Sequence, residues 1–463
     1  MRWILCAFLL VGVLPAAETP DTPAGQVLAR WLEAFNSGDR ARLQDCLQVY
    51  APKSLEKLDD VLEFRERTGG FHLISILKSA EFALEAVVKE RDGDNYRAWI
   101  LEVESVAPHR IVTMSVRVTA APASASAVTR LGEKEAASAW QAELKRRAAE
   151  DSFAGAYLWA RGGKTIATGA LGLADRERKL PNALATQFRL GSMNKMFTAV
   201  AVLQLVEKGR LGMDDVIGKH LREYPNKDLA AKVTVRQLLT HSGGTGDIFT
   251  PEYERKRLEL RTLQDYVALY GARELKFEPG TRWEYSNYGF ILLGVLVERL
   301  SGENYYDYVR AHIFRPAGMR ATDSLPESQR VASRAAGYTR QAGKWVSNAD
   351  SLPWRGTSAG GGYSTAGDLH KFAAALLSHK LLGPALLTEA TKVQQEKGGY
   401  GFGFGVENEG GVLRFGHGGG APGMNGVLHV YPAGGDVIVV LSNLDPPAAT
   451  RMADWLEQRL PVR

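Results

Sequence analysis

Cysteine is nearly absent from this 463-residue chain, which has two, Cys6 and Cys46. Cys6 lies in an apolar run at the beginning of the chain, and if that run is removed, one thiol is left and no intramolecular disulfide can form. Cys46 follows Leu43 at helical spacing, so we expect a buried small hydrophobe rather than a nucleophile. The hydrophobic core alone must then hold the protein together.

Charge of one sign is not in large excess either. The net charge is +5, and no run of like charges concentrates it. A nucleic-acid-binding protein needs a basic patch or stripe, so that class is disfavoured. Hydrophobic residues make up 45% and charged residues 24%, which excludes collagen-like and wholly disordered chains. The histidines are scattered, and none pairs with cysteine or carboxylate at a metal-ligand spacing, so we expect no metal and no cofactor.

Long apolar runs are also missing after the first residues, because the later runs are short and broken by charges. The beginning differs: Arg2 precedes an apolar stretch from Ile4 to Leu14, and the small residues Ala16-Ala17 follow it. This order is typical of a secretory signal peptide, which we assign to residues 1–17. We therefore expect an exported protein, periplasmic or secreted, with no membrane span once the signal peptide is removed.

The rest of the chain divides into two predicted domains and a connection. Residues 22–121 are predicted to form a small α+β domain, because an amphipathic helix precedes β-rich stretches at 96–103 and 110–119. Residues 122–132 begin with small, nearly featureless sequence, which predicts a linker. Residues 133–463 form the larger domain.

Strands are expected at both ends of the larger domain, with mostly helical sequence between them. At its start, residues 156–161 and 164–170 are β-rich, and Gly162-Gly163 is a hairpin turn signal. At its end, residues 426–431 and 437–442 flank a second turn. We therefore predict one antiparallel sheet built from both ends of the domain and flanked by helices, together with a helical subdomain.

Ser192 and Lys195 form the most informative motif of this domain. The apolar sequence from Met196 to Leu203 predicts a buried helix with Ser192 at its start, where unpaired N–H groups and a partial positive charge favour an alkoxide. Lys195 follows on the same face, and a lysine in an apolar site loses its proton more easily than in water. Taken alone, the motif is also compatible with an ordinary N-capping serine and a lysine in the first turn.

A second motif, Tyr285-Ser286-Asn287, precedes an apolar helix predicted over residues 289–300. A tyrosine beside a lysine ammonium is drawn toward phenolate, so Tyr285 can carry a proton between nucleophile and leaving group. Asn287 can orient the lysine or a substrate carbonyl. The alternative is a turn with a helix-capping asparagine.

A glycine-rich stretch, His417-Gly418-Gly419-Gly420, precedes the terminal hairpin. Glycine lets a strand backbone approach a ligand closely and donate its N–H groups. A second N–H beside that of Ser192 would form an oxyanion hole. The alternative is a surface or core histidine in a flexible glycine loop.

In this order, the three elements resemble those of the serine β-lactamase and penicillin-binding-protein superfamily, and most closely its class C-like branch, which includes esterases and D-amino-acid peptidases. The stretches Val233–Gly244 and Ser358–Thr365 also match the texture of that family. The resemblance covers about residues 136–460 and implies an α+β, β-lactamase-like fold. In the smaller domain, the sequence WLEAFNSGDRARLQ resembles nuclear-transport-factor-2-like (NTF2-like) domains, which hold small apolar ligands or mediate dimer contacts.

The resemblance also implies roles for individual residues. Ser192 is the acylated nucleophile, Lys195 its activating partner, and Tyr285 the general base and then acid, while Asn287 lines the cleft. The implied reaction is attack on an ester or amide carbonyl, formation of an acyl-enzyme on Ser192, and hydrolysis by water.

One stretch departs from the family pattern. His417-Gly418-Gly419 stands where the penicillin-handling members carry Lys-Thr-Gly, and Gly420 is the implied second oxyanion-hole donor. The lysine charge and the threonine hydroxyl hold a substrate carboxylate in those members, whereas a histidine is largely neutral at pH 7. We therefore expect uncharged or differently shaped acyl substrates, such as short esters or peptide amides.

Three functions remain open on the sequence. The first is an exported serine hydrolase that cleaves an ester or amide of a small molecule or peptide. The second is a β-lactamase or DD-peptidase acting on β-lactams or cell-wall peptides. The third is a non-catalytic sensor that recognises penicillin, against which the presence of Ser192, Lys195 and Tyr285 argues. The oligomeric state is not readable from the sequence.

Overall fold

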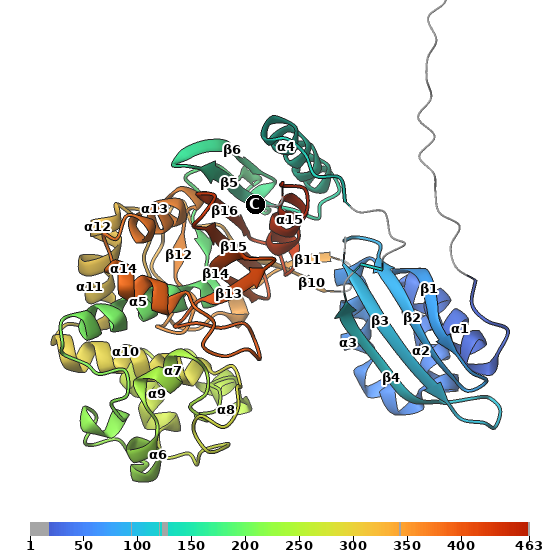
Figure 1. Cartoon of the computed structure of the whole chain (residues 1–463), viewed down its shortest axis with the longest axis horizontal. Coiled ribbons are helices and arrows are strands. Elements are labelled where there is room, and N and C mark those ends of the chain that lie inside the picture. Colours follow the sequence, from blue (N-terminus) through green and yellow to red (C-terminus); the bar gives the residue numbers. More distant parts are fainter. Residues whose placement is uncertain (1–17, 94, 120, 123–127, 342–343, 462–463) are drawn as a thin grey trace, which may run out of the picture. The chain divides into compact units, whose positions relative to one another are not determined.

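The computed structural model describes residues 18–461 except 94, 120, 123–127 and 342–343. The predicted signal peptide, residues 1–17, lies outside the described residues, as does part of the predicted linker, 123–127. The chain forms two compact units, which meet in sequence between Thr129 and Arg130 (Figure 1). No helix among the described residues is both long and apolar enough to cross a membrane.

The first unit packs helices against one four-stranded antiparallel sheet, with strand order β1-β2-β3-β4 (Figure 1). Its elements are α1 (Pro23–Ser37), α2 (Arg40–Tyr50), η1 (Pro52–Lys57), α3 (Leu58–Thr68), β1 (Phe71–Ser79), β2 (Ala83–Glu90), β3 (Tyr96–Val103) and β4 (Ile111–Thr119). The α1 helix begins at the Thr22 cap and ends at Gly38, whose φ of 67° is left-handed. In its core, the rings of Trp31 and Phe35 stack 4.5 Å apart. The resemblance of this unit to NTF2-like domains stays a prediction.

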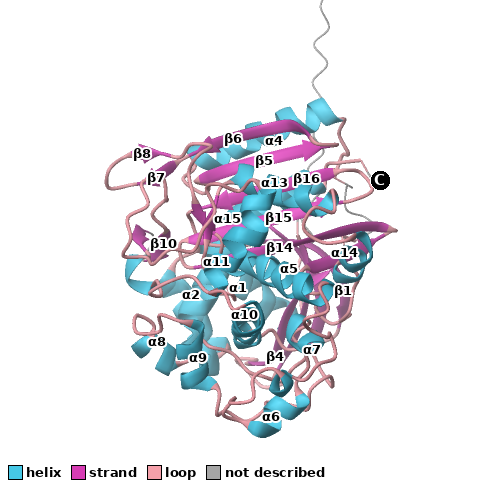
Figure 2. Cartoon of the chain, turned by 90° about the vertical axis from the view of Figure 1, so that its left-hand side faces the viewer, coloured by secondary structure: helices cyan, strands magenta, loops and turns pink. Residues whose placement is uncertain are grey.

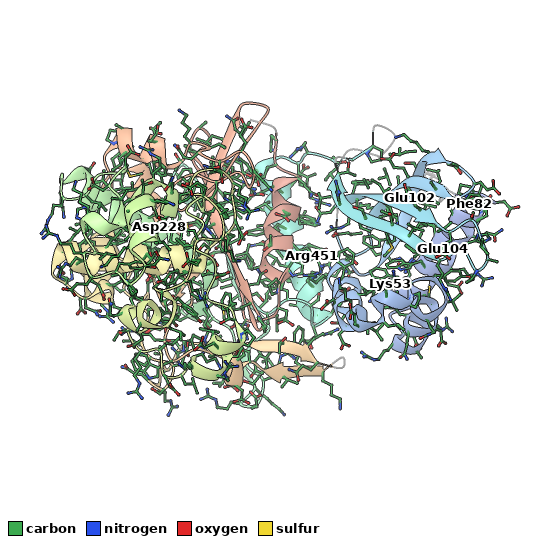
Figure 3. All side chains as sticks on the ribbon, turned by 90° about the horizontal axis from the view of Figure 1, so that it is seen from below. Lys53, Phe82, Glu102, Glu104, Asp228 and Arg451 are labelled. Atoms are coloured by element: carbon green, nitrogen blue, oxygen red, sulfur yellow. The ribbon has the colours of Figure 1, made fainter. Side chains whose placement is uncertain are left out.

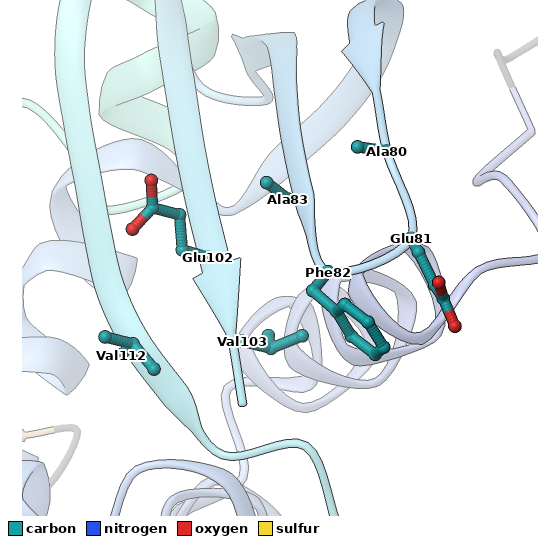
Figure 4. A pocket seen from close by; sticks show the side chains of 7 residues that line it. All are labelled: Ala80, Glu81, Phe82, Ala83, Glu102, Val103 and Val112. Carbon is teal, nitrogen blue, oxygen red and sulfur yellow. The ribbon is translucent and has the colours of Figure 1, made fainter. Parts of the chain in front are cut away.

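A hollow of about 460 Å³ opens at one end of this sheet (Figure 4). Its lining residues are Ala80, Glu81, Phe82, Ala83, Glu102, Val103 and Val112. Phe82 and Glu102 are seen in another orientation in Figure 3, with Glu104 beside them. None of the lining residues belongs to the motifs that suggest chemistry.

The second unit is built on a six-stranded antiparallel sheet, with strand order β13-β14-β15-β16-β5-β6 (Figure 2). Its strands are β5 (Gly155–Arg161), β6 (Lys164–Leu171), β13 (Gly405–Glu409), β14 (Val412–Ala421), β15 (Met424–Tyr431) and β16 (Asp436–Ser442). The β16 strand pairs with β5, which confirms the predicted sheet from both ends of the unit. The sequence missed β13, and the stretch expected to precede the terminal hairpin, 417–420, lies inside β14.

Both faces of this sheet are covered by helices. Successive side chains of a strand point to opposite faces, and apolar ones occur on both. The helices are α4 (Glu133–Ala149) and α15 (Ala448–Glu457) on one face, and α5 (Asn194–Glu207) and α13 (Ala366–Leu377) on the other. In β5, Leu158 faces the larger core, whereas Tyr157 and Trp159 face α4 and α15. Trp140 of α4 donates a hydrogen bond to the Met452 carbonyl of α15 at 2.7 Å.

Several shorter elements complete the unit. The other α-helices are α6 (Lys227–Lys232), α7 (Val235–Leu239), α8 (Pro251–Lys256), α9 (Leu263–Tyr270), α10 (Asn287–Ser301), α11 (Tyr305–Val309), α12 (Arg315–Ala317) and α14 (Pro384–Ala390). The 3-10 helices are η2 (Gly191–Met193), η3 (Ile217–Lys219) and η5 (Ala349–Ser351), and η4 (Arg310–Phe314) is a π-helix. The minor strands are β7 (Leu173–Asp175), β8 (Leu180–Pro181), β9 (Phe188–Arg189), β10 (Tyr338–Gln341), β11 (Lys344–Ser347) and β12 (Tyr363–Ser364). The apolar α10 packs against α5, α7 and α9, so its first residue lies close to the start of α5.

Candidate active site

Ser192 lies on the single turn η2, which leads directly into the buried helix α5. Gly191 precedes it with a φ of 53°, a left-handed conformation that favours glycine. The Gly191 carbonyl accepts a hydrogen bond from the Gly361 N–H at 3.1 Å, so a neighbouring loop fixes the turn. The Ser192 side chain is half-buried and therefore accessible to a substrate.

Lys195 is fully buried, and its amine has three partners. Its Nζ lies 3.3 Å from Ser192 Oγ, 2.7 Å from Asn287 Oδ1 and 2.5 Å from the Ala359 carbonyl oxygen. Burial lowers the pKa of Lys195 to about 7, against the opposing charge of Asp247. A neutral amine has two N–H groups, which can donate hydrogen bonds to Asn287 Oδ1 and to the Ala359 carbonyl oxygen. Its lone pair is then free to face Ser192.

Tyr285 lies against both Lys195 and a buried histidine. The centre of its ring is 4.7 Å from Lys195 Nζ and 4.2 Å from the centre of the His241 ring. Burial raises the pKa of the Tyr285 phenol above its usual range, and hydrogen bonding to Ser192 only partly opposes this shift. The shift runs opposite to the expectation that Lys195 draws Tyr285 toward phenolate, because burial disfavours the charged form. The direction of the shift favours the neutral phenol, whereas the lowered pKa of Lys195 suits this amine to accept a proton.

Asn287 is the first residue of α10, and the helix cap is its neighbour Ser286 rather than Asn287 itself. The Asn287 Oδ1 atom accepts from Lys195, while its Nδ2 donates to both carboxylate oxygens of Asp247 at 3.0 and 3.2 Å. Asp247 was missed by the sequence reasoning. Its only sequence signal is a carboxylate at the end of a glycine-rich stretch, 241–247.

His241 was also missed as a site residue, although it lies within a stretch that matched the family texture. Its ring Nδ1 accepts the Ser286 N–H at 3.1 Å, and its carbonyl accepts the Glu284 N–H at 3.0 Å. Burial, aided by the Lys195 charge, lowers the pKa of His241 well below its usual value, so the ring is neutral. His241 therefore fixes Tyr285 in two ways: it binds the backbone of both residues that flank Tyr285, and its ring packs against the Tyr285 ring.

The glycine stretch of β14 lies directly against the turn that carries Ser192. An ideal Cβ on Gly419 would lie 1.9 Å from the Leu190 carbonyl oxygen, and one on Gly191 would lie 3.1 Å from the Gly420 nitrogen. Ala421 pairs with Met424 across the turn, so N–H groups alternate along β14 and that of Gly420 points away from β15. The Gly420 nitrogen therefore lies beside Gly191, the residue before Ser192, which is compatible with the predicted role of its N–H as a second oxyanion-hole donor.

The surroundings of His417 disfavour a charge on its ring. Its Nε2 lies 2.8 Å from the Tyr400 hydroxyl and its Nδ1 lies 2.5 Å from the Gly418 carbonyl oxygen. Because a carbonyl oxygen can only accept, Nδ1 carries the proton and Nε2 accepts from Tyr400. Burial, with the Lys195 charge, lowers the pKa of His417 to about 4. Both ring nitrogens are thus occupied, and the ring is neutral near pH 7.

The structure therefore brings the predicted residues Ser192, Lys195, Tyr285 and Asn287 into contact, and places the stretch 417–420 along the Ser192 turn. The arrangement suits nucleophilic attack by a hydroxyl on a carbonyl carbon, with an amine as proton acceptor. Over the described part of the chain, no group of three or more His, Cys, Asp or Glu side chains is arranged to hold a metal ion.

Comparison with known proteins gives a matching family model, relatives and solved structures. The family model described as Beta-lactamase matches residues 140–462. The putative penicillin-binding protein PbpX of Bacillus subtilis (strain 168) is 30% identical over 304 residues, which cover 63% of this chain and 71% of that protein. The crystal structure of a penicillin-binding protein from Bacillus halodurans is 33% identical, with a TM-score of 0.62, over 67% of this chain and 98% of that one. A D-stereospecific amidohydrolase from Streptomyces sp. is 28% identical, with a TM-score of 0.58, over 70% and 98%.

Proposed function

Because this chain belongs to the β-lactamase family and is a serine hydrolase of that fold, we propose that it cleaves an ester or amide through an acyl-enzyme on Ser192. One observation carries the proposal: a buried amine with a pKa of about 7, Lys195 Nζ, lies 3.3 Å from Ser192 Oγ. A lysine that only capped a helix turn would be solvated and charged. This one is desolvated and in contact with the hydroxyl that it would activate.

The proposed reaction runs in two halves. Ser192 Oγ attacks the substrate carbonyl carbon while Lys195 takes its proton, and the N–H groups of Ser192 and Gly420 stabilise the oxyanion. Tyr285 gives its phenolic proton to the leaving alcohol or amine and recovers one from the Lys195 ammonium. Water then attacks the acyl-enzyme, the same groups carry its proton to Ser192, and the acid product leaves.

The substrate class follows from His417 and Gly418. His417 presents no charge and no free N–H, because its nitrogens bind Tyr400 and the Gly418 carbonyl. An ideal Cβ on Gly418 would have no neighbour closer than 3.8 Å, so a side chain would fit there, but glycine supplies no hydroxyl. We therefore propose acyl substrates without a carboxylate at this position, such as short esters or peptide amides. The similarity to a D-stereospecific amidohydrolase supports the amide class.

The predicted signal peptide, residues 1–17, supports a further part of the proposal, which is that the enzyme acts outside the cytoplasm. The alternatives are a β-lactamase or DD-peptidase and a non-catalytic sensor. A substrate panel tests all three.

The experiment compares the wild type with Ser192→Ala and with Ser347→Ala, an exposed serine on β11 that serves as control. The substrates are neutral p-nitrophenyl esters, their carboxylated analogues, D- and L-aminoacyl amides and β-lactams, and a fluorophosphonate labels the nucleophile. We expect turnover and labelling that Ser192→Ala abolishes and Ser347→Ala leaves intact, with neutral substrates preferred. Labelling without turnover would support the sensor instead. Preference for carboxylated analogues or β-lactams would overturn the proposed substrate class.

A further inference from the structure

We propose that Asp247 is a positioning residue of this enzyme: its carboxylate fixes the side-chain amide of Asn287 so that the amide oxygen, not the amide nitrogen, faces Lys195. The inference rests on the proposed function, because it assigns Asp247 to the machinery that activates Ser192. Asp247 itself does not contact the Lys195 amine through any of the hydrogen bonds found there.

The two ends of an asparagine amide are nearly equal in size, so sterics alone do not choose between its two orientations. A carboxylate only accepts hydrogen bonds, so Asp247 must meet the amide nitrogen, at 3.0 and 3.2 Å. The amide oxygen is then left for Lys195 Nζ at 2.7 Å. With the opposite orientation, an N–H donor would face the amine and occupy the lone pair intended for the Ser192 proton.

Asp247 is itself held by several hydrogen bonds, as a residue that orients another side chain must be. Its Oδ1 accepts the backbone N–H of Asn287 at 3.3 Å and that of Ile248 at 2.6 Å. Its backbone carbonyl accepts from Arg273 at 2.8 Å. The carboxylate also stands at the first turn of α10, a helix of 15 residues, where a negative charge is favoured.

Asp247 differs from the other titratable groups around Lys195 because it carries a charge. Tyr285 faces the amine as a neutral phenol, and His241 and His417, which feel its charge, are both neutral. Asp247 is the anionic partner and favours the ammonium form of Lys195. Removal of this charge should therefore let the amine lose its proton at lower pH.

Two variants separate the charge of Asp247 from its hydrogen bonds. Asp247→Asn keeps an oxygen acceptor but removes the charge, so we expect the acidic limb of the kcat/KM profile to move to lower pH, by roughly 0.5–1 pH unit. Asp247→Ala removes the acceptor, so we expect kcat to fall roughly 10- to 100-fold while KM changes less. The matched control is Asp228→Asn, a surface carboxylate on α6 that is labelled in Figure 3. We expect no change in its profile.

The profiles are measured with a neutral nitrophenyl ester on the full chain, and melting temperatures are recorded in parallel. If Asp247→Asn keeps the wild-type pH profile, or if Asp247→Ala keeps the wild-type kcat, the positioning role is overturned. Should Asp247→Ala fail to fold, the Asp247→Asn profile alone decides. Failure of the proposed function is recognised separately, because turnover would then survive in Ser192→Ala.

Discussion

The amine of Lys195 lies 3.3 Å from the hydroxyl of Ser192, yet the lysine is completely buried while the serine is half-exposed. The substrate therefore meets the nucleophile, whereas the base behind it is shielded from water. Burial lowers the pKa of the base, and the apolar helix α5 provides that burial.

The first prediction concerns pH. Lys195 accepts a proton only as the neutral amine, and that form prevails above its pKa of about 7. We therefore expect kcat/KM to rise with pH and to level off above about pH 7, measured from about pH 5 to about pH 9. The variant Lys195→Arg, which stays protonated, should lose this activity across the range. A wild-type profile that stays flat from acid to neutral pH would contradict the assignment of Lys195 as base.

The second prediction concerns Tyr285→Phe. The variant keeps the ring that packs against His241, with ring centres 4.2 Å apart, but loses the hydroxyl, so we expect folding to be retained and kcat to fall about 10²- to 10⁴-fold. Steady-state kinetics and the melting temperature measure the two effects. Tyr96→Phe in β3, which belongs to the unit without the site, is the control and should match the wild type. Full activity of Tyr285→Phe would exclude Tyr285 as a proton carrier.

The third prediction compares two neighbouring glycines of β14. A Cβ on Gly419 meets the Leu190 carbonyl oxygen at 1.9 Å, so Gly419→Ala must push the strand away from the Ser192 turn. We expect a destabilisation of about 1–3 kcal/mol and a loss of kcat of roughly 10- to 100-fold. Gly418→Ala has its nearest neighbour at 3.8 Å, so its stability should stay within about 0.5–1 kcal/mol of the wild type. Urea unfolding and ester turnover test the pair, and equal effects at both positions would refute the strand placement.

The fourth prediction concerns the core behind the site. Phe197 of α5 is 2% exposed, and its ring meets those of Phe314 and Phe372 edge-to-face at 5.0 and 4.9 Å. We expect Phe197→Ala to reduce the unfolding free energy of this unit by about 3–5 kcal/mol. Leu184→Ala, at a position 55% exposed in the same unit, should change it by less than about 0.5 kcal/mol. Denaturant unfolding measures both, and a small loss for Phe197→Ala would mean that the core collapses around the gap.

Local sequence was sufficient to predict the parts of the site that depend on spacing. Ser192 and Lys195 are three residues apart on one helical surface, so the periodicity of α5 alone brings them together. The pairing of β5 with β16 was likewise predictable, because both are β-rich stretches at the ends of one segment. The β13 strand was missed, since Gly405–Glu409 is short and carries little alternation.

The parts that depend on tertiary contacts were not predictable. Asp247 and His241 act on residues 40 and 45 positions further along the chain, and nothing in their own segment indicates those partners. The protonation state of Tyr285 was wrongly inferred, because the sequence shows the nearby cation but not the depth of burial. The neutral state of His417 was expected, but its bond to Tyr400 depends on a loop that has no sequence signature.

The pairing of β5 with β16 has a consequence for a polypeptide that is shortened at its C-terminal end. The glycine strand β14 is held by β15, and β15 is held by β16. A nascent or C-terminally clipped polypeptide that ends before Asp436 thus lacks the support for its oxyanion-binding backbone, although Ser192 and Lys195 are already present. Such a shortened polypeptide should therefore lack hydrolytic activity.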